Sequence, residues 1–199
     1  MPAENIHPLT KRLLARTEKE NLLGHKGAVF WMCGLSGSGK STLAVELERK
    51  LADESIHSIV LDGDNLRSTL NKDLGFSEED REENLRRVSE VAKLLVGNGL
   101  VVIVSFITPL EKFRKQARNL IGDEDYFEVF VKASFETCRQ RDVKGLYAKA
   151  GEGEIEDFTG KDSAFEEPVS PWLCIDTEAE DPGKSSDVLF RAIANEIRP

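Results

Sequence analysis

A glycine-rich run near the start of the chain has the composition of a phosphate-binding loop. Residues 34–41 read Gly-Leu-Ser-Gly-Ser-Gly-Lys-Ser, which matches the spacing G-x-x-x-x-G-K-[ST]. Glycines let backbone N–H groups turn inward around phosphate oxygens, and a helix beginning near Lys40 adds the positive end of its dipole. Lys40 is expected to reach the β- and γ-phosphates, and Ser41 to bind Mg²⁺. The residues predicted to bind ATP in this run are Gly34, Leu35, Ser36, Gly37, Ser38, Gly39, Lys40, Ser41 and Thr42.

Two carboxylates follow the next apolar run and are candidates for metal binding and proton transfer. Asp62 and Asp64 come directly after residues 58–61, whereas the apolar run 100–104 ends in Ser105 without an acid. One acid could lie near the metal while the other accepts the proton of an attacking hydroxyl. The alternative is an ordinary turn in which Asp64 caps a helix, and capping is compatible with catalysis. A carboxylate aimed at a hydroxyl favours a kinase over an NTPase that uses water.

Arginine and asparagine are concentrated downstream of the two acids. Arg81 and Asn84 are three residues apart and share one helix face if the helix has begun there. Arginine suits multidentate recognition of phosphate or sulfate. For any single arginine in a segment as acidic as residues 77–80, a solvated face with salt bridges is the alternative. The members of this group are Arg67, Arg81, Asn84, Arg86 and Arg87.

Short apolar runs alternate with amphipathic stretches from Ala28 onward. This alternation predicts an α/β fold of the P-loop NTPase type, with a mostly parallel central sheet and helices on both faces. The predicted strands span residues 28–33, 58–61, 100–104, 127–131 and 172–175. The predicted helices span 40–53, 64–70, 78–96, 109 to about 120, and 185–197, with Pro109 in the first turn of its helix.

Two segments lie outside this alternation. Residues 1–25 are predicted to form an N-terminal helical arm, because Leu9, Leu13 and Leu14 recur among basic residues. The arm could serve as a dimer contact or substrate cover, or pack as a helix on the edge of the kinase domain, residues 26–199. Residues 144–171 contain several glycines and little periodicity, and a long irregular stretch of this kind predicts a lid.

Composition limits the class of protein. The 199 residues carry a net charge of −9, which argues against nucleic-acid binding. No run approaches the roughly 20 apolar residues that span a bilayer, and no signal peptide is evident. Cys33 and Cys174 stand in apolar runs and are expected to be buried thiols, and no zinc or disulfide spacing is visible. These features predict a cytoplasmic enzyme.

Several runs together resemble the adenylylsulfate kinase family in its stand-alone form. They include Leu-Asp-Gly-Asp-Asn-Leu-Arg at 61–67, Asp-Leu-Gly-Phe-Ser at 73–77, and Asp-Arg-Glu-Glu-Asn-Leu-Arg-Arg-Val at 80–88. The likeness continues through residues 105–107, 141–147 and 158–160 and covers nearly the whole chain. The resemblance implies transfer of the ATP γ-phosphoryl group to the 3′-hydroxyl of adenosine 5′-phosphosulfate, with Mg²⁺, in sulfate assimilation. It also implies a homodimer.

The resemblance assigns roles at the catalytic centre. Asp62 and Asp64 match the family's acidic pair, with Asp62 near the metal together with Ser41 and Asp64 near the 3′-hydroxyl. Ser105 matches a serine that carries a phosphoryl group in some relatives, although a place in the pocket wall is the preferred interpretation. Arg141 is placed on the ATP side.

The resemblance also assigns the residues that bind the acceptor. Phe76 and Phe158 match aromatic residues that sandwich its adenine, as purines favour stacking on aromatic faces. The remaining residues implied to bind adenylylsulfate are Arg67, Arg81, Asn84, Phe106, Ile107 and Lys144.

One segment departs from the family pattern. Many relatives continue with Ser-Pro-Tyr-Arg after the Phe-Ile pair, whereas residues 108–111 here are Thr-Pro-Leu-Glu, which puts a substrate contact from Leu110 or Glu111 in doubt. Two other functions stay open on the sequence alone. One is a different small-molecule P-loop kinase, and the other is a non-catalytic nucleotide-binding module that regulates a sulfate-assimilation partner.

Overall fold

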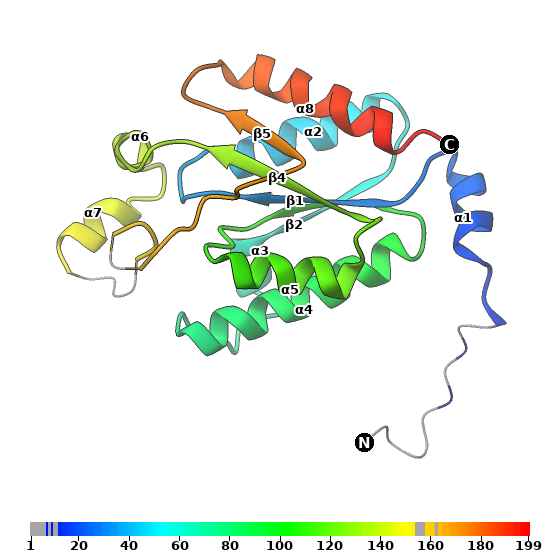
Figure 1. Ribbon diagram of the computed structural model, residues 1–199, viewed down its shortest axis with the longest axis horizontal. Coiled ribbons are helices and arrows are strands. Elements are labelled where there is room, and N and C mark those ends of the chain that lie inside the picture. Colours follow the sequence, from blue (N-terminus) through cyan, green and yellow to red (C-terminus); the bar gives the residue numbers. More distant parts are fainter. Residues whose placement is uncertain (1–6, 8, 10–11, 154–157, 162) are drawn as a thin grey trace.

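A computed structural model describes residues 7, 9, 12–153, 158–161 and 163–199 (Figure 1). The strands are β1 (Ala28–Cys33), β2 (Ser58–Asp62), β3 (Val101–Ser105), β4 (Tyr126–Lys132) and β5 (Leu173–Asp176). The helices are α1 (Arg16–Leu23), α2 (Lys40–Asp53), α3 (Gly63–Arg67), α4 (Glu78–Val96), α5 (Glu111–Ile121), α6 (Phe135–Arg141), α7 (Leu146–Gly151) and α8 (Pro182–Glu196).

The described strands form one sheet in the order β2-β3-β1-β4-β5, and every pairing is parallel. β1 lies in the middle and all six of its residues are buried, which explains its unbroken apolar sequence. The predicted fold class, a parallel sheet with helices on both faces, is confirmed.

Helices cover the two faces in pairs, α2 with α8 and α4 with α5 (Figure 1). Alternation along β1 divides its side chains between two cores, because successive residues of a strand point to opposite faces. Phe30 and Met32 pack with the apolar residues of α2 and α8. Val29 and Trp31 pack with those of α4 and α5. The central strand therefore anchors both layers and holds the loop that follows it.

The carboxyl ends of the strands place the chemical groups side by side. In the register of β2 and β3, Asp62 stands beside Ser105, and in that of β1 and β3, Met32 stands beside Ser105. The P-loop begins one residue after β1 ends. Ligands of open α/β folds bind at this edge, and the predicted catalytic groups all lie there.

The N-terminal helix differs in position from the predicted one. Leu9, Leu13 and Leu14 precede α1 and are each more than half exposed. α1 itself is held against the domain by Arg16, whose Nη1 lies 2.6 Å from Asp125 Oδ2 and whose Nη2 donates to the Gly27 carbonyl at 2.9 Å. Residues 1–6, 8, 10 and 11 of the predicted arm lie outside the described residues.

Other boundaries also differ from prediction. Pro109 is not in the first turn of α5, because the helix begins at Glu111 with Leu110 as its N-cap. Cys174 is exposed and not buried, since β5 is an edge strand, whereas Cys33 is buried as expected. The short helices α6 and α7 were not predicted, and α7 lies inside the segment predicted as a lid. Residues 154–157 and 162 of that segment are outside the described part.

Candidate active site

The P-loop connects β1 to α2 and requires glycine at its first position. Gly34 has a φ of 151°, and a Cβ there would lie 2.4 Å from the Val131 carbonyl oxygen. Gly39, the N-cap of α2, has a φ of 103° in the left-handed region that side chains disfavour. The loop therefore brings backbone close to β4 and leaves the N-terminus of α2 open toward the cavity, as anion binding requires.

Lys40, which is predicted to bind the ATP phosphates, is buried under the P-loop. Its Nζ donates to the carbonyl oxygens of Gly34 at 2.9 Å and Leu35 at 2.7 Å. Burial, together with the nearby charge of Lys144, lowers the pKa of Lys40 to about 8. An anion bound at this position would stabilise the charged form of the Lys40 ammonium group.

Asp62 links the metal-binding candidates to the first turn of α3. Its Oδ1 accepts hydrogen bonds from the backbone N–H groups of Asp64 at 3.1 Å and Asn65 at 3.4 Å. Its Oδ2 accepts from Ser41 Oγ at 3.0 Å, and Ser41 Oγ lies 3.4 Å from Ser105 Oγ. The N-cap of α3 is therefore Asp62, not Asp64, and the cap leaves Asp64 available for chemistry.

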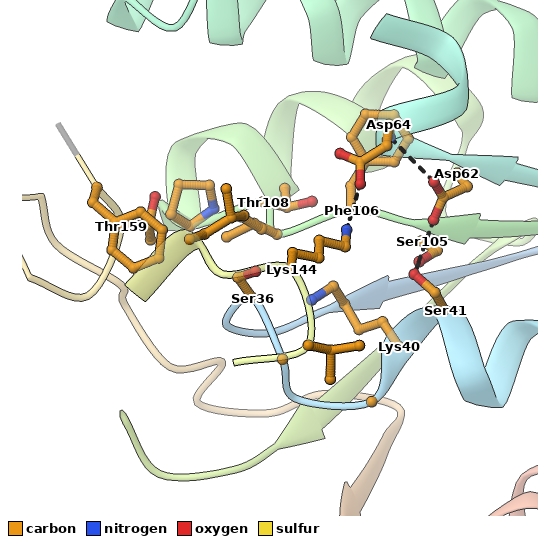
Figure 2. Close-up of a pocket in the computed structure, with 18 of the residues that line it drawn as sticks. Ser36, Lys40, Ser41, Asp62, Asp64, Ser105, Phe106, Thr108, Lys144 and Thr159 are labelled. Carbon is orange, nitrogen blue, oxygen red and sulfur yellow. Dashed lines mark hydrogen bonds and ion pairs between the residues drawn. The ribbon is translucent and has the colours of Figure 1, made fainter. Parts of the chain in front are cut away.

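Asp64 points across the cavity to Lys144. The two side chains form an ion pair, and both are about half-exposed or more. Figure 2 shows Lys144 reaching Asp64 while Asp62 contacts Ser41, so that the two acids serve different neighbours. Lys40 lies near enough to Lys144 for their charges to interact. Two cations and two carboxylates thus surround one space.

Arg67 and Arg81 converge on the loop before α4. Arg67 Nη1 donates to the Gly75 carbonyl at 2.7 Å, and its guanidinium lies 4.4 Å from the centroid of the Phe76 ring. Arg81 Nε donates to the Phe76 carbonyl at 2.8 Å, and its Nη1 donates to Thr159 Oγ1 at 3.0 Å. Burial and then the charge of Arg81 lower the pKa of Arg67, because both disfavour its charged form. A bound anion would stabilise that charged form.

The two predicted stacking residues have different surroundings. Phe76 is 63% exposed, whereas Phe158 is buried and meets Tyr147 edge-on with ring centroids 4.8 Å apart. Tyr147 in turn donates from its hydroxyl to the Ser36 carbonyl at 2.8 Å. The Phe158 side is therefore attached to the P-loop through α7, and the Phe76 side is held by the two arginines.

A single cavity of about 1190 Å³ collects nearly all of the predicted residues. Three predicted P-loop residues, Gly34, Leu35 and Ser38, do not line it and are buried. The predicted residues that do line it are Ser36, Gly37, Gly39, Lys40, Ser41, Thr42, Asp62, Asp64, Arg67, Phe76, Arg81, Asn84, Ser105, Phe106, Ile107, Arg141, Lys144 and Phe158.

The residues that replace the family's Tyr-Arg pair, Leu110 and Glu111, lie away from this cavity. Within the described residues, Thr108 and Pro109 line it but Leu110 and Glu111 do not. Glu111 pairs instead with Lys115 on the surface of α5 at 2.9 Å, and Leu110 packs on the core under α4 and α5. The change from Tyr-Arg to Leu-Glu therefore alters groups outside the cavity wall.

Thr177 is a site residue that was not predicted. It follows β5, lines the cavity and donates from Oγ1 to the Ser38 carbonyl at 2.8 Å. Arg141 Nη1 donates to Thr177 Oγ1 at 3.0 Å and to the Gly37 carbonyl at 3.3 Å, which places Arg141 beside the P-loop. Its position directly after the last strand is the sequence signal that could have identified Thr177 as a site residue.

The described residues lack two features that bear on metal binding and on membranes. They contain no cluster of three or more His, Cys, Asp or Glu side chains that could hold a metal ion. Nor does any helix among them have the length and apolar character needed to cross a membrane.

Comparison with known proteins gives consistent matches over most of the chain. A family model described as adenylylsulphate kinase matches residues 26–176. An adenylyl-sulfate kinase of Phocaeicola vulgatus is 47% identical over 193 residues, 97% of this chain and 95% of its own. A probable adenylyl-sulfate kinase of Halalkalibacterium halodurans is 55% identical over 161 residues, 81% of this chain and 79% of its own.

A solved structure gives the same result in three dimensions. The Mycobacterium tuberculosis APS kinase CysC, solved in complex with AMPPNP and APS, superimposes with a TM-score of 0.81 at 46% identity. The match covers 85% of this chain and 98% of that one.

Proposed function

The chain belongs to the adenylylsulfate kinase family, and on that premise we propose how its residues divide the work of the reaction. The enzyme transfers the γ-phosphoryl group of ATP to the 3′-hydroxyl of adenosine 5′-phosphosulfate in sulfate assimilation. The products are ADP and 3′-phosphoadenosine 5′-phosphosulfate. One observation carries the assignment of roles, namely that P-loop, acidic pair and arginine pair all face the same cavity.

ATP binds at the P-loop, with its phosphates around the N-terminus of α2. The ammonium of Lys40 leaves the carbonyl oxygens of Gly34 and Leu35 and interacts with the β- and γ-phosphates. Arg141 and Thr177, which both touch the P-loop backbone, form the wall on this side. The environment of Lys40 supports this role, because the partners of its buried ammonium group are the Gly34 and Leu35 carbonyl oxygens and, at 3.5 Å, Ser38 Oγ.

The hydroxyl of Ser41 and the carboxylate of Asp62 would hold Mg²⁺ together with the phosphates. Their oxygen atoms lie 3.0 Å apart, and hydroxyl and carboxylate are ligands that Mg²⁺ accepts. The ion would neutralise charge on the transferring group. Asp62 is suited to this task because the cap on α3 fixes the orientation of its carboxylate. Ser105, beside both groups, is proposed to form the pocket wall.

Asp64 is proposed to orient the 3′-hydroxyl and accept its proton. Its pairing with Lys144 places a cation where the γ-phosphoryl group must pass between donor and acceptor. Phosphoryl transfer depends mainly on positioning and on stabilisation of charge. Asp64 would position the hydroxyl, and Lys144 would stabilise the charge. Lys144 would exchange its contact with Asp64 for one with the phosphoryl oxygens as the reaction proceeds.

Adenylylsulfate would lie between the arginine pair and the start of α7. Arg67, Arg81 and Asn84 are proposed to bind its phosphosulfate, and Phe76 and Phe158 to stack on its adenine. The connection of Arg81 to both Phe76 and Thr159 supports this placement, since Thr159 adjoins Phe158. Phe106 and Ile107 would contribute backbone contacts.

The larger organisation of the molecule is also proposed here. Residues 1–25 form a peripheral arm on the kinase domain of 26–199, which is supported by the family match beginning at residue 26. Residues 144–171 act as a lid that excludes water from the site. A homodimer and a cytoplasmic location complete the proposal. The location is supported by three cysteines that form no disulfide, and sedimentation analysis would test the dimer.

A coupled assay of ADP release with MgATP, run with and without adenylylsulfate and with the product identified, tests the function. Release that depends on adenylylsulfate and yields the 3′-phosphorylated product is expected. Tight binding of both nucleotides without turnover would indicate a regulatory module instead. Failure to bind adenylylsulfate would indicate a kinase for a different acceptor.

A further inference from the structure

The loop after β3, residues 106–109, is attached to the core at every position. The Phe106 N–H donates to the Met32 carbonyl at 3.2 Å, and the Ile107 carbonyl accepts from the Gly34 N–H of the P-loop at 3.2 Å. Thr108 adopts a φ of 43°, in the left-handed region that a β-branched residue rarely occupies. This conformation costs free energy and persists only where the surroundings enforce it.

Two N–H groups of this loop have no acceptor in the part of the chain that the structure describes. They belong to Ile107 and Thr108, both of which line the cavity, and Thr108 is almost completely buried. Buried backbone N–H groups nearly always have a partner, so a bound ligand is the natural acceptor for them. The loop conformation thus decides which donors the cavity presents.

Arg114 enforces this conformation from below. It lies in α5 with its side chain 3% exposed, and its Nη1 donates to the carbonyl oxygens of Thr108 at 3.1 Å and Pro109 at 3.3 Å. Trp31 adds to the support, because its indole Nε1 donates to Thr108 Oγ1 at 2.9 Å, and the Glu166 N–H donates to the Pro109 carbonyl at 2.8 Å. Figure 2 shows Thr108 beside Phe106 at the cavity wall.

Glu128 on β4 is the charge partner of Arg114. Its Oε2 lies 3.6 Å from Arg114 Nε, and its side chain is 9% exposed. Burying such a pair is unfavourable, and apolar residues of similar volume often serve stability as well or better. Stability alone therefore does not account for an arginine at this position. The two N–H groups of Arg114 Nη1 can hold two carbonyl oxygens at once, which an apolar residue cannot.

We propose that Arg114 is a positioning residue for the acceptor nucleotide, which holds residues 107–109 so that the Ile107 and Thr108 N–H groups face adenylylsulfate. Arg114 itself touches neither substrate and acts through the loop. The inference rests on the proposed function, since it assumes that adenylylsulfate occupies this side of the cavity. ATP lies on the P-loop side, so its KM should be insensitive to replacement of Arg114.

The test compares Arg114→Met/Glu128→Gln with wild type. The double change removes the guanidinium and the buried carboxylate together, so that no unpaired charge remains to unfold the protein. We expect the KM for adenylylsulfate to rise about tenfold or more and the KM for ATP to stay within about twofold. Arg114→Lys, which keeps the charge and can donate to a carbonyl, should recover part of the loss. Arg118→Met, one turn further along α5 and partly exposed, is the matched control and should match wild type.

Two results would overturn the proposal. One is a folded double variant whose KM for adenylylsulfate equals that of wild type, and the other is an equal rise in both KM values. If the double variant does not fold, Arg114→Lys decides by the same criterion. Failure of the proposed function is a separate result. In that case the wild-type protein itself would show no turnover of adenylylsulfate.

Discussion

Lys144 and Asp64 form an ion pair between the segment after α6 and the first turn of α3, across the space where two nucleotides must meet. The pair neutralises both groups while substrates are absent. It also places the proposed base next to the cation that would follow the phosphoryl group. This arrangement makes Asp64, not Asp62, the acid with freedom to meet a hydroxyl, because Asp62 is committed to α3 and Ser41.

Replacing Asp64 by Asn should remove the base with little change in shape. We expect kcat to fall by about 10²- to 10⁴-fold, because general base catalysis contributes that much, with small changes in both KM values. Steady-state kinetics with MgATP and adenylylsulfate measures this. Asp53→Asn, the same chemical change at the exposed end of α2, is the control and should behave as wild type. A kcat of Asp64→Asn within about threefold of wild type would remove Asp64 from the mechanism.

The predictable part of the fold is the part with strong local signals. β1, α2 and α4 were placed correctly because an unbroken apolar strand, a P-loop and a long amphipathic helix each carry their own pattern. The helices α6 and α7, of seven and six residues, are too short for a periodic pattern. The exposure of Cys174 depends on the order of strands in the sheet, which no local pattern contains.

The same distinction applies to the site. The placement of Lys40, Asp62 and Asp64 at one cavity was predictable, because the P-loop is a spacing motif and both acids follow a strand. Arg114 and Glu128 were not, since their pairing joins a helix to a neighbouring strand through the core. One signal was present: Glu128 interrupts the run of apolar and aromatic residues from Tyr126 to Val131, and a buried charge requires a partner. Its partner could not be chosen among the basic residues from sequence alone.

The protonation of Lys40 should make ATP binding dependent on pH. Its pKa is lowered to about 8 by burial, and phosphate binding favours the charged form and raises that pKa again. ATP affinity should therefore fall as the pH rises through about 8, and the protein should take up a proton on binding near that pH. Calorimetry at pH 8 in two buffers of different ionisation enthalpy measures the uptake.

Lys40→Arg provides the control for this measurement. A guanidinium stays protonated throughout the range, so any proton uptake by the ATP phosphates themselves remains while the Lys40 contribution disappears. Equal uptake by wild type and Lys40→Arg would show that Lys40 is already fully charged in the free protein, contrary to this prediction.

Arg81 should matter for the acceptor and not for ATP. We expect Arg81→Met to raise the KM for adenylylsulfate by about 10- to 100-fold, because a hydrogen bond to a charged group contributes about 1.5–3 kcal/mol. Arg86→Met is the matched control, since Arg86 lies on the same helix but pairs with Glu83 at the surface. Binding of adenylylsulfate by calorimetry, with ATP binding measured in parallel, distinguishes the two sites. Equal losses for both ligands would point to general disruption of the cavity.

Ser105 should prove dispensable for phosphoryl transfer. Its Oγ is buried 3.4 Å from Ser41 Oγ at the carboxyl end of β3, where it can form part of the wall around the γ-phosphoryl group. If transfer is direct from ATP to the 3′-hydroxyl, Ser105→Ala should keep kcat within about fivefold of wild type. Ser41→Ala should lose far more, because Ser41 is the proposed metal ligand. Incubation with γ-labelled ATP in the absence of adenylylsulfate provides the direct check. Stoichiometric label on Ser105 that adenylylsulfate then removes would establish a covalent intermediate and refute direct transfer.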